Sequence, residues 1–488
     1  MVVFRKNKKR IFVASFLTIV SLCFLGAGFL LDNRFPNTDL SIEEINAHGD
    51  PMANTRQVFQ SGGAARSVPF RILFYGQSIT EGAWPSQVVD IWRARYPHLA
   101  IVSENRAIGG FASPRLRRTI EADVADLSPD LVVFHVYGSH PEYEETIEIL
   151  NRMTSADVIL QTDHAKAWPA PRCEMGVTFF PSKSPGCTGF PFRQQIGWSE
   201  YMSYHFVPTV ALRYGFAVEP RLQRWTEQLQ RRGLEPSDML KDMVHLNEDG
   251  ERMMAELFDA FVEKLVHERK TPSKGRRIRM NVPAPETDGS ITLTVPEAYR
   301  IEAVGNTLLP PNGLVEVSQQ PVETLDECYM HGRPSRLNKD LVWPGIMQVG
   351  ASAPLVEETW TVVITNITED AESFSYEVFG SITGYDGAGS SDQDFTSSSQ
   401  RVVLRAQDWM LAEARKAFDM SFSAPLEIFW RARYLCDDTV EVASAHGTKY
   451  IRTLATGLGA GPHFIRLTMG ADNLAAIDYF LITRSRAF

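Results

Sequence analysis

The chain has 488 residues, of which 44% are hydrophobic and 22% charged, and its formal net charge is −10 at neutral pH. This length exceeds what one compact core accommodates and predicts two or three domains. The negative charge argues against nucleic acid as a partner, because a nucleic-acid-binding face has to neutralise phosphates. The sequence also has no P-loop, no dinucleotide-binding glycine motif and no His/Cys cluster with metal-ligand spacing, so we expect no cofactor and no metal ion.

The N-terminal residues predict a membrane anchor. Five positive charges in FRKNKKR (4–10) precede 21 uncharged, mostly apolar residues at 11–31. A bilayer needs about 20 such residues, whereas the apolar part of a cleaved signal peptide has roughly 7–15. We therefore expect residues 1–32 to be a basic cytoplasmic end and a single transmembrane signal anchor, with the rest of the chain outside the cytoplasm. Secretion after signal cleavage is the alternative.

The cysteines fit an oxidising compartment. Cys23 lies in the apolar run, which leaves an even number beyond it: Cys173, Cys187, Cys328 and Cys436. Cys173–Cys187 and Cys328–Cys436 are disulfide candidates, the first closing a short loop and the second stapling the C-terminal region. Four buried free thiols are the alternative.

An α/β domain is predicted over residues 68–270, after a polar linker at 33–67. Apolar strands alternate there with amphipathic helices, and a long amphipathic helix at 249–266 closes the pattern. The expected strands are 71–76, 99–104, 131–137, 156–162 and 215–219. Short apolar strands separated by helices are typical of a doubly wound parallel sheet. The Pro- and Gly-rich stretch 163–195 breaks the rhythm and is expected to form a cap.

The C-terminal half follows a different pattern. A basic linker at 271–280 separates it from the α/β domain, and residues 281–488 contain short strands between Gly-, Asp- and Ser-containing turns. Such spacing predicts an all-β sandwich or jelly roll. This region would either bind carbohydrate or brace the first domain.

Polar and glycine-containing stretches follow the predicted strands of the α/β domain. RILFYGQSIT (71–80) places Ser78 after the first strand, NRAIGGFAS (105–113) follows the second, and VYGSHPEY (136–143) follows the third. DMVHLNEDG (242–250) lies near the end of the domain. Ligands of doubly wound sheets bind at the carboxyl ends of the strands, so we expect these stretches to meet there.

Together these stretches contain the parts of a nucleophilic site. A lone serine after a strand is often only a turn residue, and that is the alternative for Ser78. A serine becomes a nucleophile when a base and an orienting acid accompany it, and His245 and Asp242 fit those two roles. The backbone N–H groups of Ser78 and Gly110 are candidates for binding a developing oxyanion.

In this order the four stretches resemble the blocks of the SGNH (GDSL-like) hydrolase superfamily, over roughly residues 70–266. The resemblance implies a flavodoxin-like sheet, a nucleophile at Ser78, an oxyanion donor at Gly110 and an acid–base pair in Asp242 and His245. The last block, DMVHLNEDG, carries the most specific match.

Two residues depart from the family pattern. Gln77 stands where the family has an aspartate outside its triad, and His140 stands where it has an oxyanion asparagine. An imidazole N–H can donate a hydrogen bond, so His140 is a candidate oxyanion donor; contact with substrate and simple packing are its other readings.

Other aromatic residues and histidines of the α/β domain have weaker assignments. Trp84 and Trp168 are candidates for a sugar-stacking wall, although isolated tryptophans more often pack in cores. His135, within the third strand, is expected to be a core histidine, and His164 and His205 are assigned no role.

An exported α/β domain of this type joined to a β-sandwich is similar to enzymes that remove acetyl groups from polysaccharides. We therefore expect a serine esterase that acts outside the cytoplasm through an acyl-enzyme. Its expected substrates are O-acyl esters, with acetyl as the expected acyl group, on carbohydrates or on other small ester substrates. An O-acyltransferase with the same triad and a non-catalytic carbohydrate-binding or scaffold protein are the alternatives. The sequence gives no indication of oligomeric state.

Overall fold

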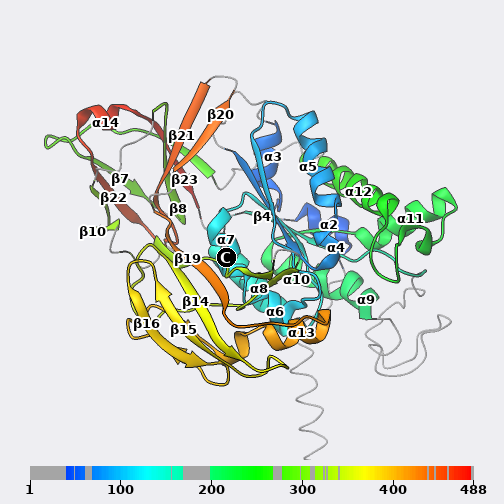
Figure 1. The fold of residues 1–488 in the computed structure, drawn as a ribbon. Coiled ribbons are helices and arrows are strands. Elements are labelled where there is room, and N and C mark those ends of the chain that lie inside the picture. The colour runs from blue at the N-terminus through cyan, green and yellow to red at the C-terminus, as the bar shows by residue number, and fades with distance from the viewer. Residues whose placement is uncertain are drawn as a thin grey trace, which may run out of the picture.

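The computed structural model describes most of the chain between Leu40 and Arg484 (Figure 1). The described ranges are 40–48, 50–60, 69–154, 156–168, 198–267, 277–296, 298–307, 314–322, 325, 328–338, 341–436, 439–444, 447–458 and 461–484. The predicted anchor and most of the predicted cap at 163–195, with Cys173 and Cys187, lie outside them. Within these ranges, no helix is long and apolar enough to cross a membrane.

The first domain is built on a parallel sheet of five strands in the order β2-β1-β3-β4-β5. The strands are β1 (Phe70–Gly76), β2 (Ile101–Asn105), β3 (Leu131–His135), β4 (Asp157–Gln161) and β5 (Ala217–Glu219). This is the flavodoxin-like strand order of doubly wound sheets. Every residue of β1, β3, β4 and β5 is buried, because helices cover both faces of the sheet.

Alternate residues of β1 point into two separate cores. Leu73 and Tyr75 pack with helices α7, α8 and α10, whereas Ile72 and Phe74 pack with helices α3, α5, α11 and α12. The main helices are α3 (Ala53–Gln60), α5 (Trp84–Arg95), α7 (Ile120–Leu127), α8 (His140–Met153), α10 (Val207–Tyr214), α11 (Arg221–Arg232) and α12 (Glu248–His267). Shorter helical segments are α2 (Ile42–Ala47), α4 (Ser78–Glu81), α6 (Ser113–Leu116), α9 (Trp198–Tyr201), the π-helix η2 (Met202–Phe206) and the 3₁₀ helix η3 (Pro236–Met239).

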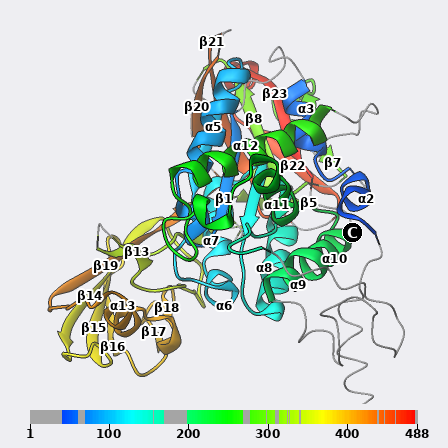
Figure 2. The same ribbon diagram turned by 90° about the vertical axis from the view of Figure 1, so that its right-hand side faces the viewer.

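The C-terminal half is β-rich and consists of two parts, which lie apart in both views (Figures 1 and 2). In the first part, the sheets β20-β21-β8-β23-β6 and β10-β9-β22-β7 share one apolar cluster and form a sandwich. Its elements are β6 (Arg277–Asn281), β7 (Ile291–Val295), β8 (Arg300–Gly305), β9 (Leu314–Val317), β10 (Gln320–Pro321), β20 (Thr439–Ser444), β21 (Gly447–Ala455), β22 (His463–Thr468), α14 (Ala471–Ala475) and β23 (Ile477–Thr483).

The second part is inserted between β10 and β20 of the sandwich. The sequence predicted a single β-region and did not indicate this division. Its main sheet has the order β11-β19-β14-β15-β16. Its elements are β11 (Tyr329–His331), β12 (Arg336–Asn338), β13 (Leu341–Pro344), β14 (Glu358–Ile367), β15 (Phe374–Gly380), β16 (Gly384–Ser390), β17 (Phe395–Thr396), β18 (Val403–Leu404), η6 (Ala406–Asp408), α13 (Leu411–Phe418) and β19 (Leu426–Tyr434). Cys328 and Cys436 form a disulfide where the chain enters β11 and leaves β19, and so close the base of this insertion.

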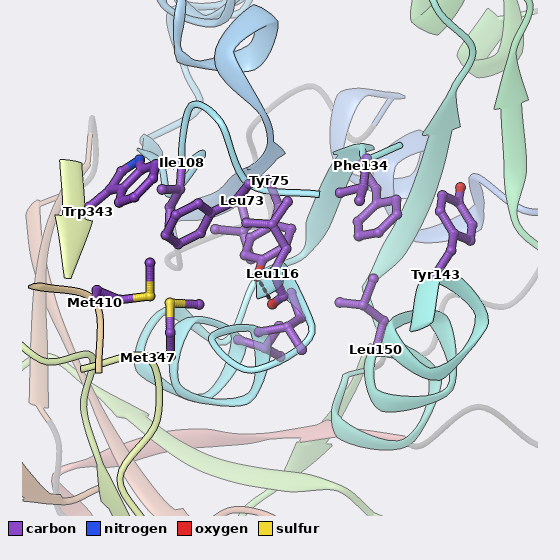
Figure 3. Packing of buried hydrophobic residues seen from close by; sticks show 14 of the residues in the cluster. Leu73, Tyr75, Ile108, Leu116, Phe134, Tyr143, Leu150, Trp343, Met347 and Met410 are labelled. Carbon is purple, nitrogen blue, oxygen red and sulfur yellow. Dashed lines mark hydrogen bonds between the residues drawn. The ribbon is translucent and has the colours of Figure 1, made fainter. Parts of the chain in front are cut away.

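The inserted part and the α/β domain share one hydrophobic core. Trp343, Met347 and Met410 of the insertion belong to the same buried cluster as Ile108 and Tyr75 of the α/β domain (Figure 3). Ion pairs surround this apolar contact, including Arg118–Asp408, Arg115–Glu413, Arg333–Asp123 and Arg433–Asp126. The inserted part therefore packs directly against the α/β domain.

Candidate active site

Strand β1 delivers Ser78 to the carboxyl edge of the sheet. The strand ends at Gly76, where a Cβ atom would lie only 2.5 Å from the His135 carbonyl oxygen on β3. A residue with a side chain therefore does not fit at the strand end. The chain turns at Gln77 and starts the short helix α4 with Ser78, which is partly exposed.

The loop after β2 lies directly over Ser78. The Ile108 N–H donates to the Gly76 carbonyl at 3.0 Å, and the Asn105 amide donates to the Thr80 carbonyl at 2.6 Å. A Cβ atom on Gly109 would lie 3.4 Å from the Ser78 Cβ. Gly110 has a φ of +80°, a left-handed conformation that favours glycine. The two glycines thus let the backbone pass close to the serine.

Ser78, His245 and Asp242 form a continuous chain of polar contacts. His245 Nε2 lies 2.9 Å from Ser78 Oγ, and His245 Nδ1 lies 2.8 Å from Asp242 Oδ2. The carboxylate is an acceptor, so Nδ1 carries the proton and Nε2 is left to accept one from the serine hydroxyl. This is the arrangement in which an imidazole acts as a base toward a hydroxyl.

Asp242 is fixed by its own turn. Its Oδ1 accepts the backbone N–H groups of Val244 and His245, each at 2.8 Å. These two backbone hydrogen bonds and the contact with the His245 ring hold the pKa of the Asp242 carboxyl well below its usual range. The Asp242 side chain is therefore a carboxylate at neutral pH and well into the acid range.

Gln77 connects two loops of the site. Its side-chain oxygen accepts the Tyr137 N–H at 3.0 Å, and its amide nitrogen donates to the Tyr137 carbonyl at 3.3 Å. The residue that departs from the family pattern therefore ties the start of α4 to the loop after β3. An aspartate offers no donor for the second of these bonds.

His140 begins helix α8, and its ring packs against the π-helix η2. The imidazole stacks on Phe206 with a centroid separation of 4.0 Å, and its Nε2 lies 3.2 Å from Met202 Sδ. These contacts show that the His140 ring packs against η2. Its role as an oxyanion donor stays a prediction.

The prediction that Trp84 lines a sugar-binding wall is wrong. The Trp84 side chain is fully buried, donates from Nε1 to the Ile79 carbonyl at 2.9 Å and packs edge-on against Phe74 and Phe258. Trp168 is exposed, and its Nε1 donates to a Glu235 carboxylate oxygen at 2.6 Å. A sugar-binding role for Trp168 stays a prediction.

The inserted β-part reaches the glycine loop through Trp343 on β13, a residue to which the sequence assigned no role. Its Nε1 donates to the Gly109 carbonyl at 2.7 Å, and its ring lies 3.2 Å from where a Cβ on Gly110 would be. The ring also packs against Phe111 and is only 4% exposed. Trp343 and Gly109 are 234 residues apart, so no local sequence pattern predicts this contact.

Comparisons with known proteins were made with the whole chain. No family model and no curated protein matches it. Among solved structures, a two-domain esterase (CEX) active on acetylated mannans is 12% identical, with a TM-score of 0.34 over 90% of this chain and 96% of its own. Axe2, an acetylxylan esterase from Geobacillus stearothermophilus, is 20% identical, with a TM-score of 0.30 over 43% of this chain and 100% of its own. LAE5, an alpha/beta hydrolase enzyme from the metagenome of Lake Arreo, Spain, is 19% identical, with a TM-score of 0.31 over 41% of this chain and 98% of its own. At identities and TM-scores this low, these likenesses decide neither family nor function.

Proposed function

We propose that the chain is a serine esterase of the SGNH (GDSL-like) type that hydrolyses O-acyl esters, chiefly O-acetyl esters of carbohydrates. The observation that carries the proposal is the chain of contacts from Ser78 Oγ through the His245 ring to Asp242, with distances of 2.9 and 2.8 Å. The carbohydrate part rests on the resemblance in sequence and on the presence of a β-sandwich.

The reaction follows from these positions. Ser78 Oγ attacks the ester carbonyl while His245 Nε2 takes the hydroxyl proton, and a tetrahedral intermediate forms. The imidazolium then gives this proton to the departing alcohol, which leaves an acyl group on Ser78. Water attacks the acyl-enzyme with His245 again as base, and the carboxylic acid and free Ser78 are released. Asp242 stabilises the imidazolium in both halves of the reaction.

The oxyanion of each intermediate needs N–H donors. We assign this role to the backbone N–H groups of Ser78 and Gly110, with His140 as a third candidate. The left-handed φ of +80° at Gly110 and the closeness of its loop to Ser78 support the assignment.

Exposure of the site favours hydrolysis over acyl transfer to a sugar. The side chains of His245 and Asp242 are 38% and 50% exposed, so water reaches the base directly. A transferase has to keep water away from its acyl-enzyme.

The location outside the cytoplasm remains part of the proposal. It rests on the apolar run at 11–31 of the sequence and agrees with the Cys328–Cys436 disulfide, a bond that persists in oxidising compartments.

The test compares the purified full chain, in detergent, with its Ser78→Ala variant on p-nitrophenyl acetate. We expect hydrolysis by the parent and only the buffer rate from the variant. Release of acetate from acetylated mannan and acetylated xylan then tests the substrate class. Equal rates in parent and variant would refute the serine mechanism.

A further inference from the structure

A buried group of ionisable residues lies beneath the proposed site and takes no part in the mechanism above. His135 ends β3, and Asp163 and His164 follow β4, at the same edge of the sheet as Ser78. All three are at most 5% exposed. The Asp163 carboxylate is shared: Oδ1 lies 2.9 Å from His164 Nδ1 and 3.7 Å from His135 Nε2, and Oδ2 lies 2.9 Å from Lys166 Nζ.

His164 makes one contact that leads straight to the site. Its Nε2 lies 2.9 Å from the carbonyl oxygen of Val244, the residue before His245. A carbonyl oxygen only accepts, so Nε2 carries the hydrogen and donates. The ring packs edge-on against Trp225, with centroids 5.6 Å apart, and Asp163 Oδ1 accepts the backbone N–H of His164 at 2.9 Å.

The Val244 carbonyl and the His245 N–H belong to the same peptide unit, which is planar. His164 holds the carbonyl end of this unit, and Asp242 Oδ1 accepts its N–H end at 2.8 Å. Both ends of the plane are therefore fixed. Its orientation sets the direction in which the His245 side chain leaves the backbone.

The turn that carries His245 needs such a brace. Residues 241–245 form neither helix nor strand, and Met243 at the tip is 87% exposed. The turn is closed by the Lys241 N–H to the His245 carbonyl at 2.9 Å, and His164 ties it to the core of the α/β domain.

We propose that His164, supported by Asp163, is a positioning residue that fixes the Val244–His245 peptide and thereby holds His245 Nε2 within reach of Ser78 Oγ. The proposal rests on the proposed esterase function. His135 extends the same cluster toward the nucleophile, because its Nδ1 lies 3.5 Å from Oγ1 of Thr80 on helix α4.

Two substitutions distinguish the contact made by His164 Nε2 from the contact made by Nδ1. In glutamine the amide nitrogen is as many bonds from Cα as Nε2 of histidine, so His164→Gln keeps a donor for the Val244 carbonyl. In asparagine the amide matches Nδ1, so His164→Asn keeps a group beside Asp163 but does not reach Val244. If His164 served only to fill space in the core, the glutamine and asparagine variants should have the same kcat.

The control is His331, a buried histidine of the inserted part whose Nε2 also contacts a backbone carbonyl. Its Nε2 donates to the Arg401 carbonyl at 2.8 Å, and its Nδ1 accepts from Trp430 Nε1 at 2.9 Å. His331→Asn therefore also removes an imidazole bond to a buried backbone carbonyl, but away from the proposed site.

The experiment measures kcat and KM for p-nitrophenyl acetate on the folded fraction of each full-length variant. Misplacing a catalytic group by about 1 Å costs about a hundredfold in rate, so we expect His164→Asn to lower kcat about 10- to 100-fold with KM unchanged. His164→Gln should recover most of that loss, and His331→Asn should leave kcat at the parent value. An unchanged kcat in His164→Asn, or equal losses in the two His164 variants, would overturn the proposal.

A second readout is independent of turnover. The proton between His245 Nδ1 and Asp242 Oδ2, which are 2.8 Å apart, should give a low-field resonance in the NMR spectrum, to be assigned by its loss in Asp242→Asn. We expect this resonance in the parent, His331→Asn and His164→Gln, and its broadening or loss in His164→Asn. If the parent hydrolyses no acyl ester, the esterase proposal fails while the resonance still decides the positioning role: its retention in His164→Asn overturns that role.

Discussion

Trp343→Phe tests whether the β-rich half takes part in catalysis. The Trp343 indole donates to the Gly109 carbonyl at 2.7 Å. This carbonyl and the Gly110 N–H, our proposed oxyanion donor, lie in one planar peptide unit. The C=O and N–H of a trans peptide point in opposite directions, so the hydrogen bond from Trp343 to the Gly109 oxygen also fixes the direction of the Gly110 N–H. Phenylalanine keeps most of the ring packing against Phe111 but removes the hydrogen bond.

The magnitude lies between two limits. A neutral hydrogen bond contributes about 1 kcal/mol net, which corresponds to about fivefold in rate if the whole loss appears in the transition state. Complete loss of one oxyanion donor costs about a hundredfold or more. We therefore expect kcat of Trp343→Phe to fall about 5- to 100-fold while KM changes little, because the donor acts on charge that develops only in the transition state.

The assay is steady-state hydrolysis of p-nitrophenyl acetate, with Trp430→Phe as the matched control. Trp430 is equally buried, lies in the same inserted part and loses a comparable indole bond, to His331 Nδ1 at 2.9 Å. Both variants should lose a similar, small amount of stability, and only Trp343→Phe should lose kcat. Parent-like kcat in Trp343→Phe, or equal losses in both variants, would refute the reasoning.

Three further predictions concern the charge, the cross-link and the loop contact described above. Because backbone hydrogen bonds hold the pKa of the Asp242 carboxyl well below its usual range, protonation of Asp242 should not contribute to the loss of activity in acid. The fall of log kcat/KM with decreasing pH should therefore have a slope of one, and a slope of two would contradict this. Replacing Cys328 and Cys436 together by serine opens a loop with a sequence separation of 108 residues and should lower the free energy of unfolding by about 2–4 kcal/mol in urea titrations. At Gln77, kcat should decrease in the order Gln, Glu, Leu as first one and then both backbone contacts to the loop after β3 are lost; a Leu variant as active as the parent would show that this tie is dispensable.

The α/β domain could be predicted from sequence because its signals are local. Apolar strands that alternate with amphipathic helices indicate a parallel sheet, and strand ends then place Ser78 at the ligand-binding edge. The helix expected at 249–266 is observed at Glu248–His267. The grouping of Ser78, Asp242 and His245 rested on the order of motifs, and the structure brings their side chains into contact.

The contacts that the sequence did not reveal are long-range or depend on side-chain direction. Trp84 comes shortly after strand β1, as a ligand-contacting residue would. As the first residue of helix α5, however, it points its ring into the core between the sheet and helix α12. The division of the β-rich half depends on which strands pair, and strand spacing alone does not determine pairing. His164 had one available signal, since Asp163-His164 follows β4 at the same sheet edge as the other site residues.

The proposed site combines one rigid element with two braced loops. Ser78 is held by β1, which pairs with strands on both sides. The loops that carry Gly110 and His245 lie outside the sheet, and in each a side chain donates to the carbonyl next to the residue in question: Trp343 to Gly109 and His164 to Val244. A brace on the carbonyl leaves the N–H of the same peptide free for another partner, and an accepting carbonyl polarises that N–H into a better donor. In one loop that partner would be the oxyanion, and in the other it is Asp242. Bracing through carbonyls thus orients the donors on which the proposed chemistry depends without occupying them.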